Sequence, residues 1–124
     1  MAFDQMVTFL ATADLEAATV FYRDRLGLDL VLDQGRCRIF RVSSTGFVGL
    51  CEGEPSPDGV IVTLVAADVE ERCRRLEEAG VAFERTAAYH PDFDITHAFL
   101  RDPDGHLVEI QRFEDPAWPA KPES

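Results

Sequence analysis

Residues 14–27 read DLEAATVFYRDRLG and have the pattern of a short, capped amphipathic helix. Apolar residues recur in this stretch at helical spacing and therefore share one face. They are Leu15, Ala18, Tyr22 and Leu26. Asp14 is placed to cap the first turn, and Gly27 is placed to end the helix. The apolar residues 6–13 just before it predict a strand, so the chain begins as strand and then helix.

The same order of elements is written twice along the chain. Three strands are expected after the first helix, at residues 28–33, 37–43 and 47–52. After the Pro- and Gly-rich linker 53–59, we expect a strand at 60–67, a helix from Asp68 to Gly80, and strands at 81–85, 95–101 and 106–113. The pattern predicts two βαβββ modules, about 6–52 and 60–113, within a single domain 1–113 followed by a Pro-rich tail 114–124.

Two stretches carry a resemblance to a known family. Residues 14–27 resemble the first helix of the vicinal oxygen chelate superfamily, and FLRDPDGHLVE at 99–109 resembles its closing hairpin. The superfamily includes glyoxalase I, extradiol dioxygenases and bleomycin-resistance proteins, and the resemblance covers about residues 6–112. It implies an α+β fold in which the two modules pair into a cup-shaped mixed sheet with the helices outside.

The resemblance also implies where a divalent metal would be held, by His, Gln or Glu side chains from four strands. The corresponding positions here are Val7, Gly49 or Leu50, Ile61 and Glu109. Only Glu109 can donate to a metal, and one carboxylate leaves a hard cation almost fully hydrated. We therefore expect no metal and no other cofactor. Catalysis is uncertain, with Glu109 as its carrier if there is any, and a divergent metal-dependent lyase or dioxygenase stays the alternative.

Apart from Glu109, which the resemblance singles out, the candidate ligand-binding residues lie on strands and in one loop. Phe9 shares strand parity with Val7, and the loop around residues 91–94 could close on a ligand. The full candidate set is Phe9, Phe47, Thr63, Tyr89, Phe93, His97, Glu109 and Gln111. A tight turn at 102–105 would pair Ala98 with Glu109 and put His97 on the opposite face, whereas a shift of one residue would reverse this.

The charge balance excludes several classes of partner. The chain of 124 residues has 12 basic and 23 acidic side chains, for a net charge of −11. Such a surface repels nucleic-acid phosphates and anionic membranes, and no apolar run approaches the roughly 20 residues of a membrane span. The acidity fits either a solubilising surface or a groove that attracts a cationic ligand.

The remaining expectations concern compartment and assembly. The N-terminal residues have no basic region before an apolar one, so we expect no secretory signal and a cytoplasmic protein. Cys37, Cys51 and Cys73 form no C-x-x-C pair, and reduced thiols are the simplest account. Family resemblance implies a homodimer. Trp118 is expected to anchor the tail on the domain or on a second subunit. The sequence thus predicts a metal-free protein that binds a small organic molecule.

Overall fold

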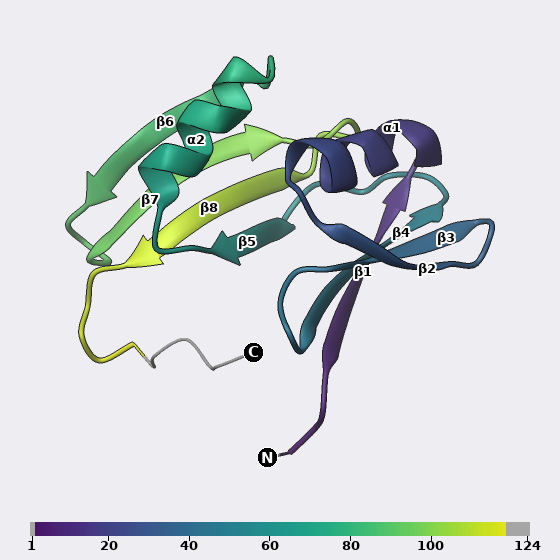
Figure 1. Ribbon diagram of the computed structural model, residues 1–124, viewed down its shortest axis with the longest axis horizontal. Coiled ribbons are helices and arrows are strands. Elements are labelled where there is room, and N and C mark those ends of the chain that lie inside the picture. The colour runs from purple at the N-terminus through teal and green to yellow at the C-terminus, as the bar shows by residue number, and fades with distance from the viewer. Residues whose placement is uncertain (1, 119–124) are drawn as a thin grey trace. The chain divides into compact units, whose positions relative to one another are not determined.

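The computed structural model describes residues 2–118, which form two compact units divided along the chain between Asp58 and Gly59. Each unit contains one four-stranded mixed sheet and its own helix (Figure 1). The order strand, helix, three strands occurs in both units, which confirms the predicted α+β class with its repeated βαβββ pattern. Within the described residues, neither helix combines the length and the apolar character needed to cross a membrane.

The first unit contains β1 (Met6–Thr12), α1 (Leu15–Thr19), the π-helical segment η1 (Val20–Arg25), β2 (Asp29–Asp33), β3 (Cys37–Arg41) and β4 (Gly46–Glu52). Its strands lie in the order β1-β4-β3-β2, with β1 parallel to β4 and the other pairs antiparallel.

The first helix forms where the sequence predicts it. The side chain of Asp14 accepts a hydrogen bond from the backbone N–H of Ala17 at 3.1 Å. Gly27 has a φ of 79°, the left-handed conformation that ends a helix at little cost for glycine. Apolar side chains of α1 and η1 pack on apolar side chains of one sheet face to form the core of this unit. The buried apolar residues are Leu15, Ala18, Phe21 and Tyr22 from the helical segment and Leu10, Phe40, Val48 and Leu50 from the strands.

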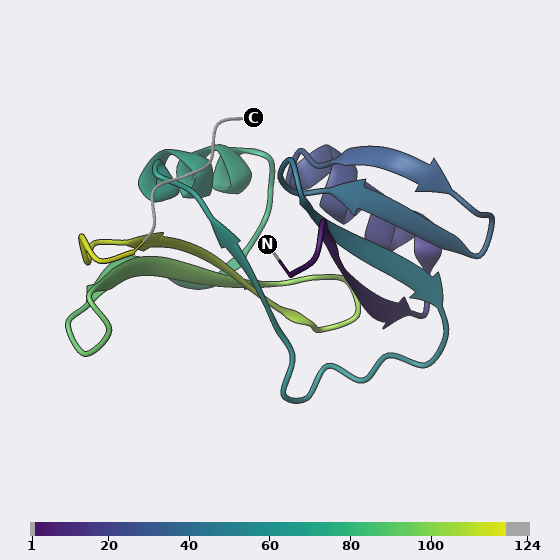
Figure 2. The same cartoon turned by 90° about the horizontal axis from the view of Figure 1, so that it is seen from below.

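The second unit contains β5 (Ile61–Val65), α2 (Val69–Glu78), β6 (Phe83–His90), β7 (Ile95–Arg101) and β8 (Leu107–Phe113). Its strands lie in the order β5-β8-β7-β6, and only β5 and β8 are parallel. Helix α2 covers one face of this sheet (Figure 2). The core beneath it consists of Val69, Cys73, Leu76, Ala98, Leu100, Val108 and Ile110. The other sheet face, which has no helix on it among residues 59–118, is called the open face below.

Strand β5 is more exposed than its composition suggests. A nearly unbroken apolar run is typical of a strand buried on both faces, but Ile61 is 56% and Val65 is 53% exposed. The reason is that β5 is an edge strand of its sheet, and Ile61 and Val65 lie on the same face as Thr63, away from the core. Strand β6 is longer than predicted, because residues up to His90 continue the ladder with β7.

The cysteines also differ from expectation. Cys37 on β3 and Cys51 on β4 are direct cross-strand partners with Cα atoms 4.1 Å apart, and a disulfide joins them. The expectation of reduced thiols is therefore wrong for this pair. Their separation of 14 residues hid the fact that a hairpin aligns them. Cys73 is a buried free thiol on α2, and burial raises the pKa of that thiol.

Candidate functional site

Four polar side chains of the second unit gather on the open face of its sheet. Thr63 on β5 and Glu109 on β8 are register partners, as are His97 on β7 and Gln111 on β8. Side chains of a strand alternate between faces, so Glu109 and Gln111 point away from the buried Val108 and Ile110 beneath α2. We call Thr63, His97, Glu109 and Gln111 the Glu109 cluster.

The carboxylate of Glu109 accepts hydrogen bonds from the other three members. Thr63 Oγ1 donates to Glu109 Oε1 at 2.9 Å, and His97 Nδ1 lies 2.6 Å from Glu109 Oε2. With its amide nitrogen turned toward the carboxylate, Gln111 donates to Oε2 and Oε1 at 2.8 and 3.0 Å. Because an ionised carboxylate only accepts, His97 Nδ1 carries the proton of this contact. Glu109 and Gln111 are both buried, so these bonds satisfy groups that water scarcely reaches.

The position of His97 corrects one step of the sequence interpretation. Ala98 pairs with Ile110 and Phe99 pairs with Glu109, one residue away from the predicted register. The turn closes between Asp102 N and His106 O, and Arg101 pairs with Leu107. This connection is one residue longer than the tight turn that the sequence suggested. His97 and Glu109 consequently share a face and touch.

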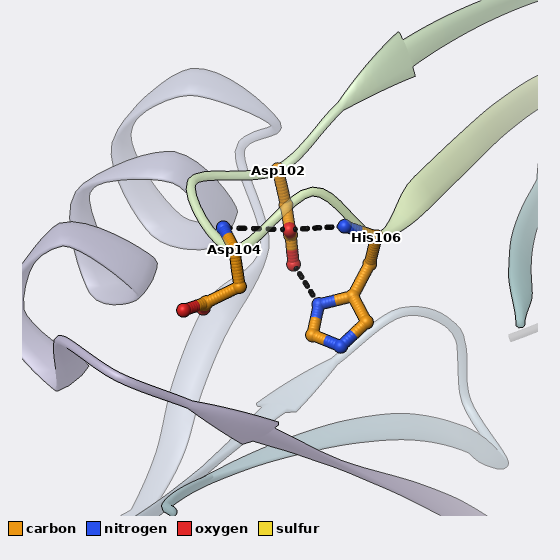
Figure 3. Close-up of side chains that lie close together, drawn as sticks. All are labelled: Asp102, Asp104 and His106. Atoms are coloured by element: carbon orange, nitrogen blue, oxygen red, sulfur yellow. Dashed lines mark hydrogen bonds and ion pairs between the residues drawn. The ribbon is translucent and has the colours of Figure 1, made fainter. Parts of the chain in front are cut away.

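That turn holds a compact group of potential metal ligands, which Figure 3 shows as Asp102, Asp104 and His106. Asp102 Oδ1 accepts from the backbone N–H groups of Asp104 and His106 at 3.0 and 2.8 Å. Asp102 Oδ2 lies 2.7 Å from His106 Nδ1. Only 1% of His106 is exposed, because it fills the turn against Asp102. These bonds shape the hairpin connection and give Asp102 and His106 a structural role.

Aromatic rings border the Glu109 cluster on two sides. The ring of His97 lies 4.8 Å from that of Phe99 and 5.6 Å from that of His90, and His90 lies 5.1 Å from Phe93. Along β8, Phe113 follows Gln111 on the same face. Sequence reasoning missed Phe99 and Phe113 as neighbours of the site. The signal was available, since each stands two residues from a candidate on the same strand.

The two candidates near the β6–β7 turn are placed differently. Phe93 is 71% exposed and lies against His90, at the end of the aromatic row. Tyr89 pairs with Thr96, so it points to the face opposite His97. Its hydroxyl donates to Asp94 Oδ1 at 2.7 Å, and that carboxylate raises the pKa of the Tyr89 phenol. The structure therefore brings Phe93 toward the Glu109 cluster and does not bring Tyr89 there.

Phe9 and Phe47 belong to the first unit. Both lie on the face of its sheet that points away from the core, where Phe9 pairs with Gly49. A Cβ atom at Gly49 would come within 2.5 Å of the Phe9 ring, so the ring occupies the space of the missing side chain. The guanidinium of Arg41 lies over the Phe47 ring, 5.0 Å from its centre. Phe9 and Phe47 thus form an apolar surface. The charged group next to it, the Arg41 guanidinium, makes a cation–π contact with Phe47.

The first unit also holds a cavity of about 450 Å³ near the start of α1. Its lining includes Glu16, Arg38 and Glu52 but none of the candidate ligand-binding residues. Arg38 donates to Thr19 Oγ1 at 2.9 Å and to Glu16 Oε1 at 2.8 Å. Arg38 and Glu16 therefore tie α1 to β3, while Glu52 pairs with Arg36.

The residues present do not fit the divalent metal that the resemblance implies. Val7 and Ile61 have no donor atom, and the ring of Phe9 fills the place where a side chain at position 49 would project. Leu50, the other register choice, is buried on the core side of its sheet. The fourth position, Glu109, has its carboxylate bonded to three protein donors. A metal there would have to displace those donors and would gain one protein ligand.

Comparisons with known proteins agree with this fold. A structure from Nocardioides, described as a glyoxalase/bleomycin resistance protein/dioxygenase, superposes with a TM-score of 0.77 at 20% identity, over 99% of this chain and 91% of that one. Lactoylglutathione lyase from Agrobacterium tumefaciens gives 0.73 at 27% identity, over 86% and 91% of the two chains. TioX from Micromonospora sp. ML1 gives 0.75 at 27% identity, over 89% and 98%.

No curated protein matches the chain in sequence. A family model does, and it spans residues 3–110, which include all of the strands in both units except the last residues of β8. The model describes the glyoxalase/bleomycin resistance protein/dioxygenase superfamily. With most of its length matched, this chain belongs to the glyoxalase/bleomycin resistance protein/dioxygenase superfamily.

Proposed function

We propose that this protein binds a small organic molecule without a metal or other cofactor. The observation that carries the proposal is the Glu109 carboxylate, which three protein side chains hold where a metal would otherwise be expected. Members of this superfamily differ in activity while sharing a fold, so the site decides between them. Here the site offers hydrogen bonds and aromatic rings, which are the means of holding an organic ligand.

The chemistry of the Glu109 cluster favours a ligand that donates hydrogen bonds. Thr63 and His97 direct donors to Glu109, so Thr63 Oγ1 keeps lone pairs for a ligand, and a neutral His97 ring would offer Nε2 as a second acceptor. Among residues 2–118, no group pairs with His97 Nε2. The cluster also contains a carboxylate, and the chain has a net charge of −11. In its finer form, the proposal is therefore a cationic ligand with N–H groups.

The alternative is a divergent metal-dependent lyase or dioxygenase. Its support is the retained Glu109 and the 27% identity to a protein described as lactoylglutathione lyase. The 27% identity to TioX is equal, so relatedness does not separate the two readings. Metal content does. We expect less than about 0.2 equivalents of Zn, Ni, Fe or Mn in protein purified after growth in metal-supplemented medium. One equivalent that survives dialysis would favour the enzyme.

Calorimetric titration tests the binding itself. EDTA-treated protein is titrated with three organic cations, namely metal-free bleomycin, ethidium and tetrabutylammonium. We expect at least one to bind with one site per chain, and Glu109→Gln to weaken it about tenfold by removing the charge. The matched control is Glu54→Gln, because Glu54 is an exposed linker carboxylate. Absence of binding heat with all three cations would contradict the proposal.

Assembly and location complete the proposal. The exposed apolar surface of the edge strands β1 and β5, at Met6, Phe9, Ile61 and Val65, supports a homodimer. Light scattering should give twice the chain mass of 13.8 kDa. The proposed location is the cytoplasm, where the Cys37–Cys51 disulfide of the structure would be reduced. Alkylation of intact cells followed by mass spectrometry tests this, and an intact disulfide in the cell would contradict it.

A further inference from the structure

We propose that Trp118 contacts the ligand and that the outer face of its indole receives a planar part of the ligand. This inference rests on the proposed function, because it adds a residue to the site that the Glu109 cluster forms. It also gives the ligand a second chemical feature. Beyond N–H groups for the Glu109 cluster, the ligand would carry a flat, positively charged ring system.

The first step is that residues 114–118 are tied to the end of the second sheet. The backbone N–H of Glu114 donates to Asp94 O at 2.9 Å, and Thr96 Oγ1 donates to Glu114 Oε2 at 2.6 Å. A turn follows, in which the N–H of Trp118 donates to Asp115 O at 3.1 Å. These bonds hold the segment at the end of the sheet where β7 begins and β8 ends.

The second step is that Trp118 lies in line with the Glu109 cluster. Its indole stacks on the Phe113 ring with centres 3.7 Å apart and planes 12° from parallel. Phe113 follows Glu109 and Gln111 on alternate positions of β8, so all three point to the open face. The stack therefore stands at the end of the same row of side chains.

The third step concerns the surface that the stack leaves exposed. Trp118 is 51% exposed although one face of its indole packs on Phe113. If Trp118 served only to anchor the tail, its indole would be buried in a core. Here half of a large aromatic side chain stays exposed at the end of the row of side chains that contains Glu109. Planar cations bind to such a ring by stacking and by cation–π attraction.

The experiment compares a planar with a non-planar cation on matched variants. Ethidium is planar and tetrabutylammonium is not, and both are titrated into wild type, Trp118→Ala, Trp118→Phe and Phe3→Ala. Phe3 is the control because it is an exposed aromatic residue of the first unit. Trp118 is the only tryptophan of the chain, so its emission reports on this position alone.

We expect Trp118→Ala to weaken ethidium about tenfold, Trp118→Phe to recover most of that loss, and tetrabutylammonium to be unaffected. Ethidium should also quench the emission of the wild type. Equal ethidium affinity in wild type and Trp118→Ala would overturn this inference and leave the proposed function standing. An equal loss for both cations would also overturn it, because it would mark a structural role for Trp118. Failure of both cations to bind the wild type would overturn the inference together with the cation-binding proposal.

Discussion

At the scale of single residues, the buried side chain of Asp102 is the one whose replacement we expect to cost the most stability. Asp102→Ala removes the acceptor of three hydrogen bonds and leaves the buried His106 without its partner. We expect the free energy of unfolding to fall by about 3 kcal/mol. Asp102→Asn keeps one acceptor oxygen and should cost about 1 kcal/mol. Urea unfolding measures both.

The control for this pair is Asp58→Ala, because Asp58 is an exposed linker residue whose removal should leave the urea midpoint unchanged. Equal losses for Asp102→Ala and Asp102→Asn would show that the carboxylate charge, not the geometry of its acceptor oxygens, holds the turn. A loss below about 1 kcal/mol for Asp102→Ala would contradict the structural role argued for the group.

The candidate site was predictable as a set of residues better than as a geometry. The family resemblance selected Glu109, and strand alternation then puts Gln111 on the same face, because a period of two needs no knowledge of the partner strand. The contact of His97 with Glu109 depends on the length of the turn that joins β7 to β8. With the tighter turn, His97 and Glu109 would lie on opposite faces of the sheet, and the one additional residue places them on the same face. The side-chain bonds of Asp102 that fix this length have no signature in apolar periodicity.

At the scale of elements, the two helices begin with the same residue type but are held differently. Asp14 caps α1 through the N–H of Ala17, whereas Asp68 makes no side-chain cap and pairs with Arg72 at 2.7 Å. No capping box forms between Asp68 and Glu71, because Arg74 and Arg75 engage Glu71. An Asp thus stands at the start of both helices, and only Asp14 uses its side chain as a cap.

This difference predicts unequal losses from matched substitutions. Asp14→Ala should lower the free energy of unfolding by about 1 kcal/mol, the usual value of a side-chain cap. Asp68→Ala removes exposed ion pairs and should cost about 0.5 kcal/mol or less. Thermal and urea unfolding of the two variants in parallel give the comparison. A larger loss for Asp68→Ala would mean that its ion pairs, although exposed, organise the start of α2.

Helix α2 and strand β8 are also joined by a charge bridge that responds to pH. Arg112 on β8 lies 2.8 Å from Glu70 on α2 and 3.0 Å from Glu114, and this guanidinium lowers the pKa of Glu70 from 4.5 to about 2. A carboxyl whose folded pKa is lowered contributes stability above its ordinary pKa and loses it as pH falls through the folded value. The contribution of Glu70 should therefore disappear between pH 4.5 and about 2.

Carbon-detected NMR titration of the glutamate carboxyl groups measures this directly. The midpoint of Glu70 should lie near 2 in the wild type and return toward 4.5 in Arg112→Gln. Arg36→Gln is the control, because Arg36 pairs with Glu52 on the first unit and should leave Glu70 unchanged. A Glu70 midpoint that is the same in wild type and Arg112→Gln would show that the bridge does not persist in solution.

At the scale of the whole molecule, the repeat made the fold predictable. Each unit is a strand, a helix and three strands, and the cap and stop residues that mark this order are local features of the sequence. The disulfide and the exposed face of β5 were not predictable in the same way. Both depend on which strands become neighbours, since Cys37 and Cys51 meet only through the pairing of β3 with β4. Which strands become neighbours depends on the packing of the whole unit and not on local sequence features.

The net charge of −11 gives the whole molecule two opposite responses to salt. Most arginine side chains of the described residues lie in exposed ion pairs, which contribute little, so repulsion among the excess carboxylates dominates the charge energy. Raising NaCl from about 0.05 to 0.5 M should screen that repulsion and raise the free energy of unfolding by about 1 kcal/mol. The same screening should weaken ethidium binding several-fold, because there the charges attract. Urea unfolding and calorimetric titration in the same buffers measure both quantities. Loss of stability with salt would mean that the ion pairs outweigh the repulsion, and ethidium affinity independent of salt would mean that the acidity has no part in binding.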